Sequence, residues 1–98
     1  MSGVADDTPV IELRNLGPAC EAGLVAAGIK NAGDIRKLGV EETFVRLMVA
    51  FERDGRGKKC YNAAYLYALY GAIHDIDWRD LPDGKKDEFK AFAAEMRG

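Results

Sequence analysis

The chain has 98 residues, 48% of them hydrophobic, which indicates one globular domain and excludes an intrinsically disordered chain. Its formal net charge of −2 excludes the overall basic excess that is typical of proteins bound along the phosphate backbone of nucleic acids. No apolar run approaches the ~20 residues that a membrane-spanning helix needs, and no signal peptide is recognisable, so we expect a cytoplasmic location without a membrane partner.

The first predicted helix follows a flexible, polar N-terminal tail at residues 1–10. It runs from Pro18 to Ala27, because proline suits the first position of a helix, where its missing N–H costs nothing. Gly28 suits the left-handed position that follows a helix. Ile29 then lies where it contacts Leu24, as in a Schellman ending.

Two further helices are predicted directly after this one. Asn31 is a suitable N-cap and Asp34 lies favourably beside the dipole of a short second helix, which Gly39 ends. A third helix is predicted from Glu41 to Asp54, and Gly55 closes it. This third helix is amphipathic, because apolar residues recur at helical spacing: Val40, Phe44, Leu47, Met48 and Phe51.

The fourth predicted helix, Tyr61–His74, is expected to be the central and most enclosed one. It holds all four tyrosines, whose spacing spreads them around the helix: Tyr61, Tyr65, Tyr67 and Tyr70. Small residues that permit the close approach of another helix flank Gly71: Ala64, Ala68 and Ala72. We expect the tyrosine rings to belong to the core, and the alternative is a set of stacking faces for nucleobases.

The chain is expected to end in a capped turn and a fifth helix. Asp77 is predicted to cap a short turn through Trp78, which we interpret as a core or rim anchor. Asp83 is predicted to cap the last helix, at residues 84–97. No stretch alternates polar and apolar residues, so no β-sheet is predicted. The sequence therefore predicts an all-α, compact five-helix domain over residues 11–97.

The segment Leu13–Pro18 looks like the hairpin of a helix-hairpin-helix element, which makes the N-terminal half helix-hairpin-helix-like. Asn15 and Gly17 tolerate left-handed or tight backbone, so that N–H groups at the following helix start point outward. Such N–H groups form an anion site, and DNA phosphate is the usual anion. The alternative is a tight turn between packed helices. Ala19 favours this alternative, because DNA-binding hairpins often carry Lys or Arg there.

A second candidate contact surface is the basic segment after the third helix, formed by Arg53, Arg56, Lys58 and Lys59. Such a local patch suits contact with phosphate or with an acidic partner. Asp54 dilutes its charge. The alternative interpretation is a solvated loop that keeps the domain soluble.

Candidates for metal binding and catalysis are few. Cys20 and Cys60 are too far apart for a CxxC motif, and the single histidine, His74, does not complete a zinc site with them. We expect both cysteines to be small buried hydrophobic residues. His74 is expected at a helix C-terminus, where positive charge is favourable. No phosphate loop, dinucleotide fingerprint or nucleophile–base pair occurs, so we expect no enzyme, no cofactor and no catalytic residue.

Several segments together resemble the C-terminal domain of the TfoX/Sxy competence regulators. They extend over about residues 11–96 and comprise Leu13–Pro18, Ala27–Ile29, Asp34–Gly39, Leu66–Ile73, Asp77–Trp78 and Leu81–Pro82. The resemblance implies a bacterial protein, a helical fold and a regulatory role. Full-length members of that family are similar in carrying a separate N-terminal α/β domain, and they act as positive regulators of DNA-uptake genes with a cyclic-AMP receptor protein.

We therefore expect a regulatory interaction module that acts through a protein partner. The resemblance implies that this partner belongs to the transcription machinery or is a cyclic-AMP receptor protein. The alternative is sequence-independent DNA binding through the hairpin. The predicted contact residues lie in the hairpin and in the basic segment: Asn15, Gly17, Ala19, Arg56, Lys58 and Lys59.

Overall fold

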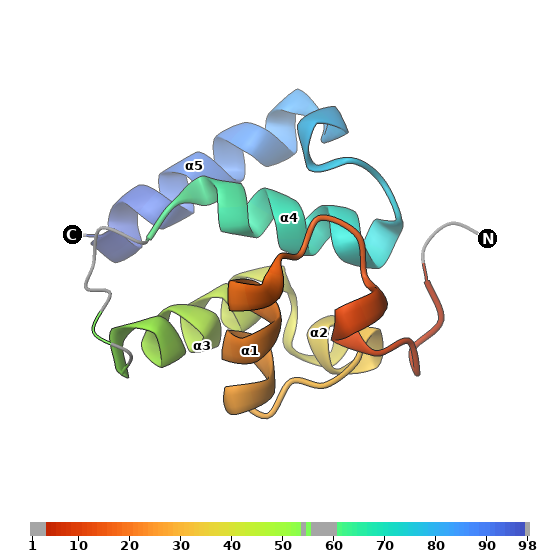
Figure 1. Ribbon diagram of the computed structural model, residues 1–98. Helices are drawn as coiled ribbons and strands as arrows, with labels where there is room; N and C mark the ends of the chain where they lie inside the picture. The colour runs from red at the N-terminus through yellow and green to blue at the C-terminus, as the bar shows by residue number, and fades with distance from the viewer. Residues whose placement is uncertain (1–3, 54, 56–60, 98) are drawn as a thin grey trace.

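The computed structural model describes residues 4–53, 55 and 61–97. In this part of the chain five α-helices and two short 3-10 helices follow one another: η1 (Val10–Glu12), α1 (Pro18–Ala26), α2 (Ala32–Leu38), α3 (Val40–Arg53), α4 (Ala63–His74), η3 (Trp78–Asp80) and α5 (Asp83–Arg97) (Figure 1). An isolated bridge pairs Pro9 with Asn31, and no β-strand occurs among these residues. The predicted all-α, five-helix fold is confirmed.

Helix α4 lies at the centre of the molecule, between α5 on one side and α1 to α3 on the other (Figure 1). Seven of its residues are buried: Leu66, Tyr67, Ala68, Leu69, Gly71, Ala72 and Ile73. Helices buried on several sides are apolar around most of their circumference, and α4 follows this rule. The prediction of a central, enclosed fourth helix is confirmed.

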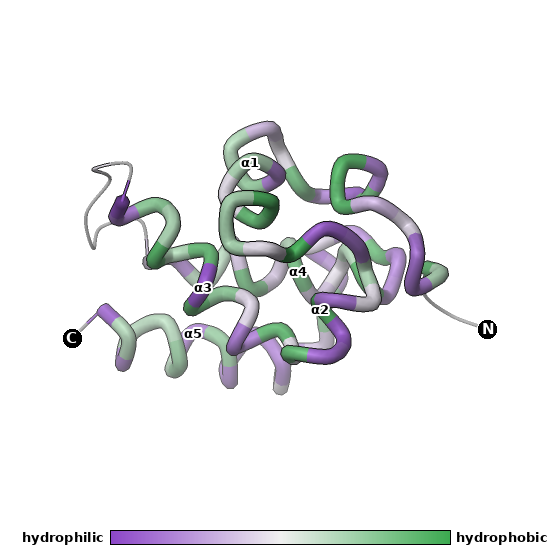
Figure 2. The backbone as a smooth tube through the Cα atoms, turned by 90° about the horizontal axis from the view of Figure 1, so that it is seen from below, coloured by the Kyte–Doolittle hydropathy of each residue, from purple (hydrophilic) through white to green (hydrophobic). Residues whose placement is uncertain are grey.

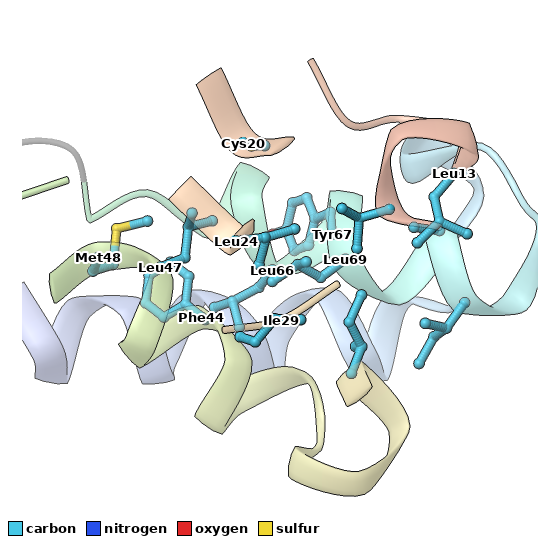
Figure 3. Packing of buried hydrophobic residues seen from close by; sticks show 14 of the residues in the cluster. Leu13, Cys20, Leu24, Ile29, Phe44, Leu47, Met48, Leu66, Tyr67 and Leu69 are labelled. Atoms are coloured by element: carbon cyan, nitrogen blue, oxygen red, sulfur yellow. The ribbon is translucent and has the colours of Figure 1, made fainter. Parts of the chain in front are cut away.

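Helices α3 and α5 are amphipathic, and both turn one apolar face to the core. Figure 2 shows hydrophobic and hydrophilic residues alternating along both helices. Phe44 of α3 is fully buried, and its ring packs edge-on against the rings of Tyr61 and Phe92, with centroids 6.0 and 6.1 Å apart. Leu24, Leu47 and Leu66 bring α1, α3 and α4 together in the same core (Figure 3).

Helix α1 ends in the Schellman motif that the sequence predicts. The Ile29 N–H donates to the Leu24 carbonyl at 2.8 Å, and the Gly28 N–H donates to the Val25 carbonyl at 3.0 Å. Gly28 has a φ of +85°, a value that L-residues with a side chain rarely adopt. Earlier in α1, Gly23 lies against α3, because a Cβ there would come within 2.5 Å of the Leu47 side chain.

Helices α2 and α3 meet at one residue. The Asn31 side chain caps α2 by accepting from the Asp34 N–H at 2.9 Å, as predicted. Gly39 ends α2 with a φ of +86°, and its N–H donates to the Ile35 carbonyl at 2.7 Å. The Gly39 carbonyl in turn accepts from the Thr43 N–H at 3.0 Å, so the same residue begins α3.

The starts of the last two long helices differ from the prediction. Helix α4 begins at Ala63 behind an Asn62 cap, so Tyr61 precedes the helix and its hydroxyl lies 2.7 Å from a Glu52 carboxylate oxygen. Asp83 is not the cap of α5 but its first residue. The Pro82 carbonyl accepts the first helical bonds from the N–H groups of Lys85 and Lys86, at 3.0 and 3.1 Å, so Pro82 takes the N-cap position.

The segment before residue 11 packs against the helices. Val10 is buried and its N–H donates to the Lys30 carbonyl at 2.9 Å. The Val4 N–H donates to the Ile73 carbonyl at 3.3 Å, and Asp6 forms a 2.6 Å ion pair with Arg36. The packed part of the chain therefore begins before residue 11, where the sequence places a flexible tail. Among the described residues, no helix combines the length and apolarity that crossing a membrane requires.

Candidate binding groove

The hairpin between η1 and α1 has one left-handed residue. Asn15 has a φ of +73°, as its position in the predicted hairpin requires. Gly17 has a φ of −90° and a ψ of 174°, which is ordinary extended backbone, so the expectation of a special conformation at Gly17 is wrong. The turn is completed at Asn15, which leaves Gly17 as the N-cap of α1, and no side chain caps this helix.

The Asn15 side chain ties the hairpin to the connection that follows α4. Its amide nitrogen donates to the Ile76 carbonyl at 2.9 Å. Gly71 makes this approach possible, because a Cβ at that position would collide with the Asn15 amide and would come within 2.5 Å of the Ile76 carbonyl oxygen. The small residue in α4 therefore admits the hairpin rather than a neighbouring helix. Asn15 positions the hairpin, and its amide is occupied inside the molecule.

A groove of about 360 Å³ lies between the start of α1 and the face formed by α4 and η3. The hairpin contributes Asn15, Gly17, Pro18, Ala19 and Cys20, and the other wall consists of Ala64, Tyr65, Ala68 and Trp78. We call these nine residues the hairpin groove. Trp78 retains 41% of its surface exposed, which places a large apolar ring at the edge of the groove. Three of the predicted contact residues, Asn15, Gly17 and Ala19, thus lie together.

The wall opposite the hairpin was not predicted from the sequence. Trp78 was interpreted as a core or rim anchor, and Tyr65 as a core residue, with base stacking as the alternative. The structure gives Tyr65 a half-buried position, with its ring centroid 5.5 Å from that of Phe51. The signal in the sequence was the row of small residues Ala64 and Ala68, which leaves room beside α4. In the structure, these small side chains leave the groove beside α1 open.

Each of the two arginines that flank the groove forms an ion pair with an aspartate. Arg79 donates to both Asp77 carboxylate oxygens at 3.1 Å, while its backbone N–H donates to one of them at 2.9 Å. The side-chain bond from Arg79, followed by its backbone bond, lowers the pKa of the Asp77 carboxyl to about 2. On the hairpin, Arg14 contacts Asp75 through the Asp75 carbonyl at 3.4 Å and a carboxylate oxygen at 3.8 Å. Each of these guanidinium groups therefore has a carboxylate within ion-pair distance.

Most of the predicted basic segment lies outside the residues that the structure describes. Arg56, Lys58 and Lys59 lie outside the described residues, and so does Asp54. Arg53 is exposed at the end of α3, beside a second hollow that is separate from the hairpin groove. The structure thus brings the hairpin residues together with Trp78 and leaves the basic segment as a prediction.

His74 is the last residue of α4, as predicted, but its electrostatic setting is the reverse of the expected one. Partial burial, followed by the charges of Arg36 and Lys85, lowers the pKa of the His74 imidazole below its ordinary value of 6.5. The ring packs on Tyr70, with centroids 4.2 Å apart. The favourable charge at this helix end comes from Arg36, which donates to the Ile73 carbonyl at 3.0 Å, so a protonated His74 is disfavoured.

The structure describes one of the two cysteines, Cys20. Cys20 is buried, in agreement with the prediction, whereas Cys60 lies outside the described residues. Within residues 4–53, 55 and 61–97, no three His, Cys, Asp or Glu residues gather in an arrangement for a metal ion. The hairpin groove, with Trp78 at its edge, is the candidate site that contains predicted contact residues.

The structure is that of a small all-α domain with a groove on its surface. Residues 7–93 match the TfoX C-terminal domain family, and the chain belongs to this family, a regulatory one that is not known for enzymatic activity. The chain is also similar to an uncharacterised protein from Listeria monocytogenes whose crystal structure is solved. The two share 34% sequence identity and a TM-score of 0.76, over 93% of this chain and 96% of that one. No curated protein shows significant similarity.

Proposed function

We propose that the protein is a cytoplasmic regulatory module that acts through a protein partner and holds an apolar side chain of that partner in the hairpin groove. The observation that carries the proposal is the exposed Trp78 ring beside the 360 Å³ groove. Tryptophan and tyrosine are enriched among the residues that dominate binding energy in protein interfaces. Membership in a regulatory family supports the same conclusion.

The shape of the groove favours an apolar occupant. Pro18, Ala19, Ala64 and Ala68 line it with short side chains, so its depth comes from missing bulk rather than from polar groups. A leucine or phenylalanine side chain has the size and chemistry to fill such a space, and Trp78 covers it from the edge. The transcription machinery and a cyclic-AMP receptor protein are the partners that the family suggests.

DNA binding is the alternative function, and the arrangement of charged residues near the hairpin supports a protein partner instead. A hairpin that binds phosphate relies on cations directed outward, because counterion release supplies most of the affinity. Here Arg14 is directed to Asp75 and Arg79 to Asp77. Ala19 adds no charge at the start of α1. A DNA function therefore rests on the basic segment around Lys58 and Lys59.

Site-specific photocrosslinking tests the proposal. A benzoylphenylalanine at position 19, at the exposed rim of the groove, is expected to give a dominant protein adduct in cells of the source organism. The matched control carries the same residue at the exposed position 90 on α5, where no such adduct is expected. Trp78→Ala in the position-19 variant is expected to reduce the adduct at least several-fold.

Two outcomes contradict the proposal. Equal adducts from positions 19 and 90 would show that the groove is not a specific site. Nuclease-sensitive adducts at position 19 would favour DNA. The DNA alternative is also tested directly, because Trp78 is the single tryptophan and its fluorescence reports on the groove. Duplex DNA at low salt is expected to leave this emission unchanged. If DNA bound to the hairpin, it would shift the emission, and the logarithm of the affinity would fall linearly with the logarithm of the salt concentration.

A further inference from the structure

A second hollow lies at the other end of α1, on the outer face of α3. Its volume is about 530 Å³, and it is lined by Ala26 and Ala27 at the end of α1 and by six residues of α3: Glu42, Val45, Arg46, Val49, Ala50 and Arg53. Val49 is 40% exposed and Val25 nearby is 52% exposed, so the surface combines exposed valines with the charged residues Glu42, Arg46 and Arg53. This face points away from the core face of α3, which carries Phe44, Leu47, Met48 and Phe51.

The six α3 residues are arranged symmetrically along the helix. Positions 42 and 53, 45 and 50, and 46 and 49 are each centred on the same point, between Leu47 and Met48. When a second copy of α3 is laid antiparallel on the first, a two-fold axis through this point places each residue opposite its counterpart. Glu42 then faces Arg53 of the second copy at both ends, and Val45 faces Ala50.

We propose that this face binds a second copy of the chain, forming an antiparallel α3–α3 homodimer. Charge complementarity identifies the occupant, since the acidic and basic ends of the face are matched only when the second helix runs in the opposite direction. Arg46 pairs with Glu42 on its own helix at 3.1 Å, which lays its aliphatic stem along the helix surface. The stem then covers Val49 of the second copy.

The small area of contact determines how strong this association is. A stable interface buries about 800 Å² on each partner, and one helix face with the end of α1 provides less. The dimer is therefore reversible and depends on protein concentration. Its contact residues differ from those of the hairpin groove, so the inference stands or fails independently of the proposed function.

Charge exchange at positions 42 and 53 tests the dimer. Sedimentation equilibrium over a concentration series is expected to show a mass rising from 10.7 kDa towards twice that value. Glu42→Arg alone places two arginines opposite each other, and Arg53→Glu alone places two glutamates opposite each other. Each is expected to raise the dissociation constant about tenfold, because like charges meet at both ends of the interface. The double variant is expected to recover to within about threefold of the original chain.

The control is Lys90→Glu on the exposed face of α5, which changes the net charge by the same amount as Arg53→Glu. It is expected to leave the dissociation constant unchanged, and circular dichroism checks that every variant folds. A chain that stays at 10.7 kDa at every concentration overturns the dimer. The dimer is also contradicted if the dissociation constant of the double variant is as high as those of the single variants. The same holds if Lys90→Glu raises the dissociation constant as much as Arg53→Glu.

Discussion

The Asn15 side chain donates a 2.9 Å hydrogen bond to the main-chain carbonyl of Ile76, which lies 61 residues further along the chain. This bond joins the two walls of the hairpin groove, because Asn15 belongs to the hairpin and Ile76 precedes Trp78. One amide group therefore serves two purposes. It satisfies a carbonyl just beyond the end of α4, and it fixes the distance between the start of α1 and the exposed tryptophan.

Two substitutions of Asn15 separate its conformation from its hydrogen bond. Asn15→Gly keeps the left-handed backbone and loses the bond to Ile76, so a stability loss of about 1 kcal/mol is expected. Asn15→Ala loses the same bond and keeps a Cβ at a φ of +73° without the polar side chain that favours this conformation, so it is expected to be about 1 kcal/mol less stable than Asn15→Gly. Urea unfolding measures both, and Trp78 fluorescence of the folded state reports the loosened groove. Equal stability of the two variants would contradict a strained backbone at this position.

Gly28 and Gly17 form a matched pair for the role of backbone conformation. A Cβ meets nothing within 4 Å at either residue, but Gly28 has a φ of +85° and Gly17 one of −90°. Gly28→Ala is therefore expected to destabilise the protein by about 1–2 kcal/mol. Gly17→Ala is expected to change stability by less than about 0.5 kcal/mol. Thermal unfolding followed by circular dichroism measures both, and a large loss at Gly17 would argue against an extended N-cap.

Thr43 is expected to be a site where a substitution stabilises the fold. Its side chain is fully buried on α3, and its hydroxyl has no hydrogen-bond partner among the described residues. Thr43→Val replaces this hydroxyl by a methyl group of similar size, so a gain of about 1–2 kcal/mol is expected in denaturant unfolding. Thr43→Ser, which keeps the hydroxyl and removes the methyl group, is the control and is expected to destabilise. A less stable valine variant would show that the hydroxyl is hydrogen-bonded.

The pH dependence contributed by His74 has a definite sign. Because burial and the charges of Arg36 and Lys85 lower its pKa in the folded protein, the folded state favours the neutral ring. Its contribution to stability is therefore complete above pH 6.5, the ordinary pKa, and is lost as the pH falls through the lower folded value. NMR titration of the imidazole is expected to give a midpoint below 6.5.

Removing one of those charges tests the cause. Lys85→Gln is expected to raise the His74 midpoint, whereas Lys90→Gln, the same change at an exposed position on α5, is expected to leave it in place. His74→Gln is expected to flatten the stability profile below pH 6.5. A midpoint above 6.5 would mean that the dipole of α4 outweighs burial and the neighbouring cations.

Helix boundaries were predictable where local chemistry sets them. Pro18, Gly28, Asn31 and Gly39 each act through their own backbone or through a side chain that reaches three residues away, and each lies where the sequence places it. Asp83 misled the prediction, because aspartate suits both the cap and the first turn of a helix. In the structure the carbonyl of the preceding proline takes the capping position.

The groove was only half predictable, because its two walls are distant in sequence. The hairpin was recognisable from Asn15 and its neighbours, but the bond from Asn15 to Ile76 has no local signal. Tyr65 lines the groove from α4 itself, whereas Trp78 reaches it through the path of the chain after α4, which depends on Gly71 leaving room for the hairpin. Such packing follows from the whole fold and not from any short pattern.

Gly39 is the single residue between α2, which ends at Leu38, and α3, which begins at Val40, and this restricts length changes at the junction. An added residue would break the hydrogen bond from the Gly39 N–H to Ile35 or the one from Thr43 to the Gly39 carbonyl, and would displace α3 relative to α2. Phe44 and Leu47, which are buried on α3, would then lose their packing in the core. Homologous sequences should therefore show no length change between Ile35 and Phe44.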